Sequence, residues 1–154
     1  PNRQNTPASL RKLYNVGTVM GNATGNIQSC TAFLGQFFVQ EDLTKFWTKY
    51  YPKLAALKEE IKVIGPDSGR SGVEAALDIE YITAMGAGVP TQFWSFAGRA
   101  PGNPDNEPFL DWMYLVANTS DATIPKIFST SYGECEVSQE REAEEARDRS
   151  RSSK

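Results

Sequence analysis

Segments with the composition of strands alternate along this chain with segments of helical pattern, and this alternation constrains the fold more than any other feature. Runs rich in β-branched and aromatic residues predict strands at 61–64, 91–96 and 124–132. Helices are predicted between them, at 73–85 and from Phe109 onward. Alternating strands and helices are typical of a parallel sheet covered by helices. We therefore expect an α/β fold, with functional residues at the carboxyl ends of the strands.

Local signals predict the remaining elements. Thr6 and Pro7 are typical of the N-cap and the first position of a helix. Residues 15–27, rich in Gly, Asn and Thr, predict a loop, and two helices are expected over about 28–39 and 41–50. A stripe of large side chains predicts that the last helix packs on the sheet: Phe109, Trp112, Met113 and Val116. An aromatic cluster predicts core packing: Phe46, Trp47, Tyr50 and Tyr51.

Two acids, Glu74 and Asp78, fall on the arc of the 73–85 helix that its apolar residues predict to be buried. The apolar residues that flank them on this arc are Val73, Leu77, Tyr81, Ile82, Ala84 and Met85. Burying two unpaired carboxylates is strongly unfavourable, so they must share a proton, find donors or line a cleft. Four residues apart on a helix, their Cβ atoms lie about 5–6 Å from each other, close enough to couple their titrations. The alternative is that the helix face carrying these acids is exposed to solvent, because surface acids at this spacing are common.

The sequence around this pair resembles that of the sedolisins, the serine-carboxyl peptidases, and most closely their tripeptidyl peptidase branch. Residues 72–81 resemble the Glu-x-x-x-Asp helix of that family. Four other segments resemble the family in the same order and spacing: 6–15, 30–38, 107–112 and 129–134. The resemblance extends to about residue 138 and implies that residues 1–138 form the N-terminal portion of a peptidase catalytic domain. The implied fold is a subtilisin-like parallel sheet flanked by helices, represented here by its first part.

The resemblance also implies a role for each acid. Glu74 matches the general base that takes a proton from a serine nucleophile, and Asp78 matches the acid that orients and supports it. A carboxylate base suits acidic conditions, and burial beside a second acid raises its pKa. The chain has no histidine, which excludes a Ser-His-Asp or Cys-His mechanism carried by this chain alone. Ser131, Tyr132 and Gly133 match the segment whose backbone pairs with the substrate.

Other parts of the family's site have no counterpart in this sequence. The Ser-Gly-Asp type motif of the oxyanion aspartate and the Gly-Gly-Thr-Ser type motif of the nucleophile do not occur. The family's calcium site follows near the C-terminus of the catalytic domain, so we expect no cofactor or metal in this chain. Without a nucleophile, we expect the chain alone to be inactive. Residues 139–154 have no large apolar side chain, which predicts a charged, disordered tail.

The net charge and short sequence motifs limit the expected binding partners and the expected cellular compartment. A formal net charge of −3 gives no reason to expect nucleic acid or an anionic membrane surface. No apolar run approaches the roughly 20 residues needed to span a bilayer. Two N-glycosylation sequons begin at Asn22 and Asn118, and with the resemblance they favour a lysosomal or extracellular protein. The expected partners are a peptide or protein substrate and the protein's own propeptide.

The two cysteines are expected to be free thiols. Cys30 lies among apolar residues of the predicted 28–39 helix, which predicts a buried thiol. Cys135 follows the Ser131–Gly133 segment, where we expect an exposed thiol.

Two other interpretations compete with the peptidase. The main alternative is a truncated, non-catalytic product that binds another protein, for instance as a decoy for the peptidase's propeptide, through exposed apolar surface. A glycosidase that uses Glu74 and Asp78 as its two carboxylates is less favoured. Glycosidase acids usually project from different elements across a sugar rather than from one helix turn.

Overall fold

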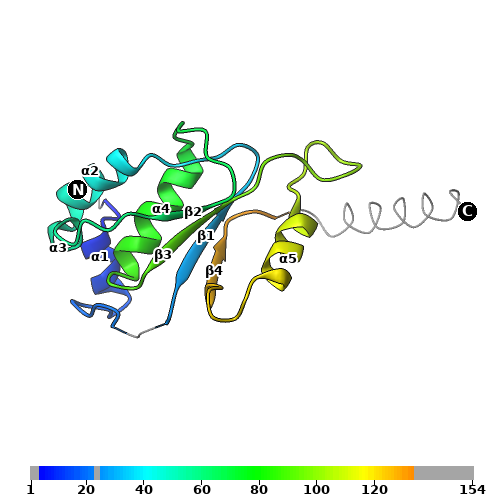
Figure 1. Cartoon of the computed structure of the whole chain (residues 1–154). Coiled ribbons are helices and arrows are strands. Elements are labelled where there is room, and N and C mark those ends of the chain that lie inside the picture. Colours follow the sequence, from blue (N-terminus) through cyan, green and yellow to red (C-terminus); the bar gives the residue numbers. More distant parts are fainter. Residues whose placement is uncertain (1–3, 23–24, 134–154) are drawn as a thin grey trace, which may run out of the picture.

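The computed structural model describes residues 4–22 and 25–133, in which helices cover both faces of a sheet (Figure 1). In chain order the elements are α1 (Pro7–Leu13), β1 (Gln28–Ala32), α2 (Gln40–Tyr50), α3 (Pro52–Ala55), β2 (Lys62–Ile64), α4 (Val73–Met85), β3 (Thr91–Ser95), α5 (Phe109–Asn118) and β4 (Ile127–Thr130). The four strands are parallel and lie in the order β2-β3-β1-β4. The predicted α/β class, a parallel sheet flanked by helices, is confirmed. Cys135 and the predicted tail at 139–154 lie outside the described residues.

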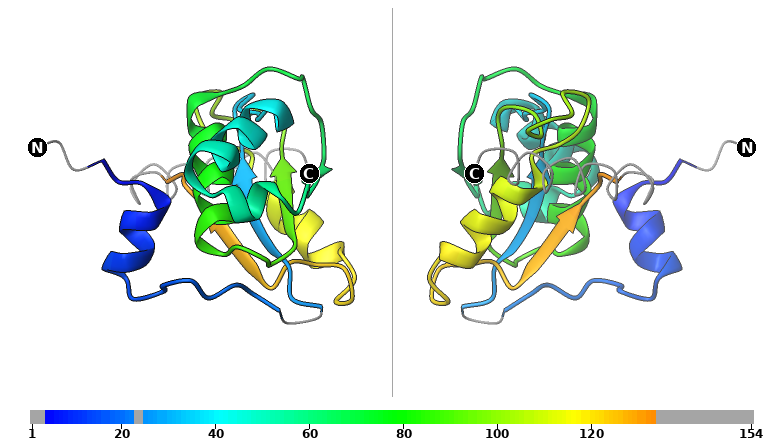
Figure 2. Two further views of the ribbon diagram at one scale, coloured as in Figure 1. Left: turned by 90° about the vertical axis from the view of Figure 1, so that its left-hand side faces the viewer. Right: turned by 90° about the vertical axis from the view of Figure 1, so that its right-hand side faces the viewer.

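The helices form two layers of unequal size. Helices α1 to α4 lie on one face of the sheet and α5 lies on the other, as the side views show (Figure 2). Helix α4 runs back from the carboxyl ends of the strands, so its first turn lies at that edge of the sheet (Figure 1). This placement matters because the carboxyl edge is where parallel α/β sheets usually bind their ligands.

The predicted helix over 28–39 is wrong, because its first residues form β1, between β3 and β4 in the sheet. Apolar residues after the strand have helical spacing, but Leu34 and Gly35 have φ values of 55° and 74°. Two consecutive left-handed residues form a turn that no α-helix can include. Cys30 therefore lies on a strand rather than a helix, and the prediction that its thiol is buried is confirmed, with 1% of the residue exposed.

The other predicted elements hold with small changes of boundary. The N-cap prediction is confirmed, since the Ser9 N–H donates to the Thr6 hydroxyl over 3.2 Å. The strand expected at 124–132 is shorter, Ile127–Thr130. Pro125 has no N–H to donate to the sheet, and pairing begins only beyond it.

The core fills the space between the sheet and the helices α2 and α4. Trp47 is 1% exposed, and its indole Nε1 donates to the Thr83 hydroxyl of α4 over 2.9 Å. Of the other residues in the predicted aromatic cluster, Phe46 and Tyr51 are partly buried and pack against this core, and Tyr50 is partly exposed. The prediction of core packing is therefore confirmed in full for Trp47 and in part for Phe46 and Tyr51.

The buried arc of α4 differs from the predicted one. Its buried residues are Ala75, Ile79, Thr83 and Ala84. Val73 is 89% exposed and Leu77 54% exposed, so the prediction that both lie on the buried arc is wrong. The helix is apolar on most sides, and small side chains such as Ala75 allow the closest approach to the sheet. Glu74 and Asp78 consequently lie at the edge of the buried arc, each partly exposed.

Arg11 is a buried basic residue that no sequence signal singles out. Its side chain is 4% exposed and donates hydrogen bonds only to backbone carbonyls. It reaches Gly17 over 2.9 Å, Ala84 over 3.0 Å and Met85 over 2.7 Å, and it also donates to Val19. The guanidinium thus joins α1 and the following loop to the C-terminal end of α4, where carbonyl groups lack helical partners.

Candidate active site

Glu74 lies in the first turn of α4, held at the carboxyl edge of the sheet by the residues around Gly72. The Gly72 N–H donates to the Phe37 carbonyl over 2.7 Å, which ties the start of α4 to the segment after β1. A Cβ atom at Gly72 would overlap the side-chain oxygen of Gln36. That oxygen is buried and accepts no hydrogen bond from the described residues. Gly72 therefore allows the close approach of this loop to Gln36, next to Glu74.

Asp78 lies one turn further along α4, which packs against β1. Burial first, and then the nearby Glu74 carboxylate, raise the pKa of Asp78 to about 6. Burial, and then the charge of Asp78, also raise the pKa of the Cys30 thiol. The surroundings of the Asp78 carboxyl therefore favour its neutral form.

Tyr132 brings the segment after β4 to the same edge of the sheet. Its hydroxyl accepts a hydrogen bond from the Phe33 N–H over 3.1 Å and donates to the Phe33 carbonyl over 3.3 Å. Burial raises the pKa of the Tyr132 hydroxyl, and the hydrogen bond with Phe33 opposes that rise. Three carboxylates add smaller increases, because their charges act on this hydroxyl: Glu74, Asp78 and Glu107. The structure thus brings Tyr132 together with the two predicted acids.

Phe33 and Glu107 belong to this site and were not predicted. The Phe33 ring packs against three other rings, with centroid distances of 5.5 Å to Phe96, 5.0 Å to Phe109 and 5.1 Å to Tyr132. This aromatic cluster joins the ends of β1, β3 and β4. Its sequence signal was an apolar residue after Cys30, which the helical assignment of 28–39 obscured.

Ser131 and Gly133, the other two residues of the predicted substrate segment, are exposed at the end of β4. Strand β4 is an edge strand of the described sheet, since only β1 pairs with it there. The backbone that follows β4 is exposed at Ser131 and Gly133.

The two sequon asparagines lie away from the acids. Asn22 is exposed in the connection from α1 into β1, and Asn118 is the exposed last residue of α5, in the connection into β4. The Asn118 side-chain amide donates to the Tyr114 carbonyl over 2.8 Å. Both connections lead to the amino ends of strands, at the edge of the sheet opposite to Glu74.

The described residues contain no group of three or more His, Cys, Asp or Glu side chains that could hold a metal ion together. The calcium site implied by the resemblance therefore stays a prediction about a later part of the domain. Within the same described ranges, every helix is too short or too polar to cross a membrane.

Neutralising Asp78 is expected to stabilise the chain at neutral pH. An acid whose pKa is higher in the folded state binds its proton more tightly there, so protonation favours folding. This contribution is fully present below the ordinary value of 3.8 and lost as pH rises through about 6. We expect Asp78→Asn to raise the free energy of unfolding at pH 7 by about 1 kcal/mol, a value reduced for solvent screening of a partly exposed group. The gain should disappear near pH 4.

Urea unfolding between pH 4 and 7 measures this effect. Glu60→Gln removes an exposed acid and is the matched control, with little change expected at any pH. An Asp78→Asn chain that is no more stable than wild type at pH 7 would show that the Asp78 environment does not favour the neutral acid.

Removing the Tyr132 hydroxyl is expected to loosen the end of β4. Tyr132→Phe keeps the ring contact with Phe33 but leaves the Phe33 N–H without its acceptor, at a cost of about 1–2 kcal/mol. The urea midpoint should fall accordingly, whereas Tyr114→Phe, at an exposed ring on α5, should leave it unchanged. Equal midpoints for the two variants would contradict the structural role of this hydroxyl.

Comparison with known proteins adds a direct observation to this geometry. No protein-family model matches the chain. The chain is 38% identical to tripeptidyl-peptidase 1 of Rattus norvegicus over 136 residues, which cover 86% of this chain and 23% of the relative. Tripeptidyl-peptidase 1 of Mus musculus and of Homo sapiens are 38% and 36% identical over the same length. The chain thus spans 23% of the length of these curated relatives.

Proposed function

We propose that this chain, which belongs to the sedolisin family of peptidases, contributes the general-base part of a serine-carboxyl peptidase of tripeptidyl-peptidase type. The observation that carries the proposal is the convergence of Glu74, Asp78 and Tyr132 at the carboxyl edge of the sheet. The tripeptidyl-peptidase 1 relatives support the reaction type. The nucleophilic serine and the oxyanion aspartate would come from family motifs that this sequence does not contain.

In the proposed reaction Asp78 supports Glu74 as a neutral neighbour. Below pH 6 Asp78 is mostly protonated, because burial and the nearby Glu74 raise its pKa to about 6. Glu74 takes the proton of the serine hydroxyl as the serine oxygen attacks the scissile carbonyl carbon, and then gives that proton to the leaving amine. A water molecule hydrolyses the acyl-enzyme by the same route in reverse. We therefore expect activity at acidic pH.

Substrate would be held by main-chain pairing. The exposed backbone of Ser131 and Gly133 follows the edge strand β4, and the Tyr132 side chain, bonded to Phe33, fixes its position. In this arrangement Tyr132 contacts the protein through its side chain, so that its backbone stays available to a peptide.

We further propose that the protein follows the secretory route, to a lysosome or to the outside of the cell. The exposure of both sequon asparagines, Asn22 and Asn118, on the side away from Glu74 supports this compartment. Its partners would be a peptide or protein substrate and its own propeptide.

Product analysis tests the proposed reaction. This chain, continued to the length of its relatives (below, the extended protein), would be incubated at pH 4 with a peptide of free N-terminus and with the same peptide acetylated. Mass spectrometry should find tripeptides released in order from the free peptide and little cleavage of the acetylated one. Internal cleavage of both peptides would support a peptidase but would overturn the proposal that it releases tripeptides. Cleavage of neither peptide would overturn the proposed function.

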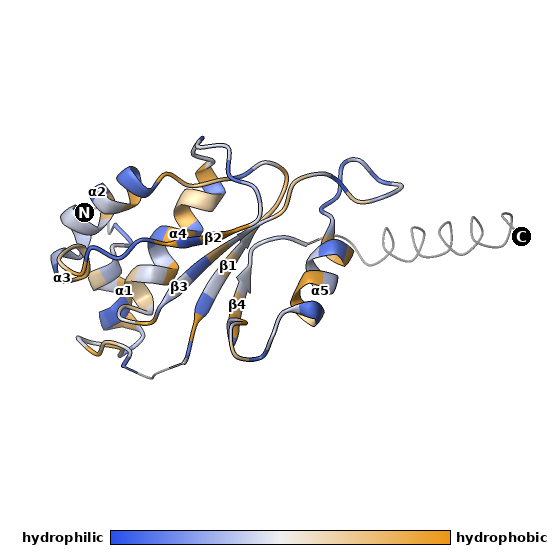
Figure 3. Ribbon diagram, viewed as in Figure 1, coloured by the Kyte–Doolittle hydropathy of each residue, from blue (hydrophilic) through white to orange (hydrophobic). Residues whose placement is uncertain are grey.

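A second candidate, a non-catalytic protein-binding product, is favoured by one observation. Large apolar side chains are exposed on two helices: Val73 and Leu77 on α4, and Leu110, Met113 and Tyr114 on α5. Figure 3 shows apolar colour on both helices. Such surface is usually covered by another polypeptide. In the peptidase account the rest of the longer protein covers it. Light scattering distinguishes the two, since a stable, monomeric chain that captures an isolated propeptide would favour the binding product.

A further inference from the structure

A cavity of about 430 Å³ opens between α2, α4 and the residues before α1. Its walls include Phe46 and Tyr50 of α2, Leu77 and Tyr81 of α4, and Asn5. Neither Glu74 nor Asp78 lines it, so it is separate from the candidate active site. The volume falls within the range of about 300–1,000 Å³ that is usual for small-ligand pockets.

Three aromatic rings line this cavity. Phe46 lies 5.0 Å from Tyr50 and 5.5 Å from Tyr81, between ring centroids, so that the three rings form one wall. The Tyr81 hydroxyl donates to the Asn5 carbonyl over 2.7 Å, which fixes that ring at the edge of the cavity. Aromatic faces attract cations, and the Lys49 ammonium already lies 4.9 Å from the centroid of Tyr50.

Glu80, a partly buried acid, also lines the cavity. Within residues 4–22 and 25–133, no hydrogen bond or ion pair engages this carboxylate. Burial, and then the charge of Asp42, raise the pKa of Glu80. A carboxylate in these surroundings gains from a cation that neutralises it.

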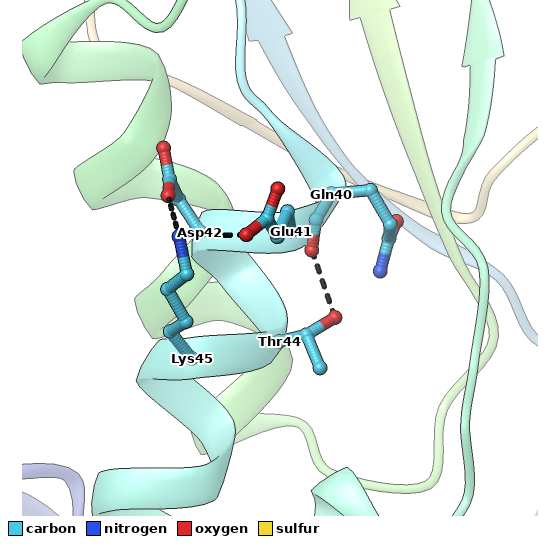
Figure 4. A network of polar contacts seen from close by, with 5 residues as sticks. All are labelled: Gln40, Glu41, Asp42, Thr44 and Lys45. Carbon is cyan, nitrogen blue, oxygen red and sulfur yellow. Dashed lines mark hydrogen bonds and ion pairs between the residues drawn. The ribbon is translucent and has the colours of Figure 1, made fainter.

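The neighbouring ammonium on α2 is already engaged elsewhere. The Lys45 Nζ lies 3.0 Å from the Glu41 carboxylate and 3.1 Å from the Asp42 carboxylate, in the first turns of α2 (Figure 4). Those two acids thus have a basic partner, whereas no basic side chain of residues 4–22 and 25–133 pairs with Glu80. An unpaired carboxylate beside aromatic faces is complementary to an organic cation with a flat or apolar body.

We propose that this cavity binds the side chain of an arginine presented by a partner polypeptide. The planar guanidinium donates to the Glu80 carboxylate and lies against the rings of Phe46, Tyr50 and Tyr81. Leu77, exposed at the rim, contacts the methylene groups of the arginine. This inference does not depend on the peptidase activity, because the cavity shares no residue with the proposed catalytic pair.

Calorimetric titration of the 154-residue chain at pH 7 and low salt tests the site. The probe is acetyl-Ala-Arg-Ala amide, and its control is the same peptide with citrulline, which matches arginine in shape but carries no charge. We expect saturable binding of the arginine peptide and an affinity at least about ten-fold lower for the citrulline peptide. Equal affinities for the two peptides, or no binding of either, would overturn the proposal without any need for a variant.

Two substitutions locate the binding. Glu80→Gln should weaken binding of the arginine peptide about ten-fold, and Tyr50→Leu should weaken it several-fold. Glu41→Gln changes a residue outside the cavity and should leave the affinity unchanged within about two-fold. Circular dichroism verifies that each variant is folded. Binding that Glu41→Gln weakens as much as Glu80→Gln does would show attraction to general negative charge rather than to this cavity.

Discussion

Glu74→Gln is expected to lower kcat/KM of the extended protein by at least about 10⁴-fold, since members of a catalytic group act as a unit. Glutamine keeps the size of the side chain and cannot accept the serine proton. Its place at the start of α4, set by the Gly72 contact with the segment after β1, should be preserved. The measurement is steady-state cleavage of an Ala-Ala-Phe reporter at pH 4.

Two further variants are compared with Glu74→Gln. Glu60→Gln, at an exposed position away from the carboxyl edge, should retain full activity. Asp78→Asn should lower kcat more than it changes KM. The amide fills the space of the carboxyl group, but it cannot bind or release a proton beside Glu74. Full activity of the Glu74→Gln protein would mean that another group is the base, and the assignment of the pair would be wrong.

Arg11→Met is expected to lower the free energy of unfolding by about 3–5 kcal/mol, the largest stability effect foreseen for this chain. Methionine fills much of the same volume but donates no hydrogen bond, so the carbonyls of Gly17, Ala84 and Met85 would lose their donor. The contact of the guanidinium with the Tyr51 ring, 5.4 Å from its centroid, would be lost as well. Urea unfolding at pH 7 measures the change.

The neighbouring residue provides a matched control. Lys12 lies on the same helix and is exposed, so Lys12→Met removes a positive charge without removing a buried donor. We expect a change within about 0.5 kcal/mol for Lys12→Met. Equal losses for the two variants would show that charge, rather than the buried hydrogen bonds, sets the effect.

The elements that could be predicted from the sequence are those whose local signals agree with the fold. Helix α1 has its Thr6 cap, and β3 has a run of aromatic and polar residues that suits a strand. Strand β1 could not be found in this way. Its buried residues include Ser29 and Thr31, while the apolar residues that follow it imitate a helix. Pairing with β3 and β4 outweighs that local pattern, and pairing is not visible in the spacing of one segment.

The candidate site likewise contains residues that could be predicted from the sequence and residues that could not. Glu74 and Asp78 stand out as acids among apolar residues, but the pattern on α4 did not predict which face of the helix is buried. The contact of Tyr132 with Phe33 joins residues 99 positions apart, and no local signal reports it. Arg11 was missed because a basic residue near the end of a short helix usually remains in solvent.

The proposed peptidase has its base in this chain and its nucleophile in another part of the family's catalytic domain. Cleavage of the Ala-Ala-Phe reporter between pH 3 and 7 tests this division, with the 154-residue chain and the extended protein assayed side by side. We expect cleavage at acidic pH by the extended protein and none above background by the chain. Cleavage by the chain itself that is lost in its Glu74→Gln variant would overturn this proposal, since the nucleophile would then lie among these residues.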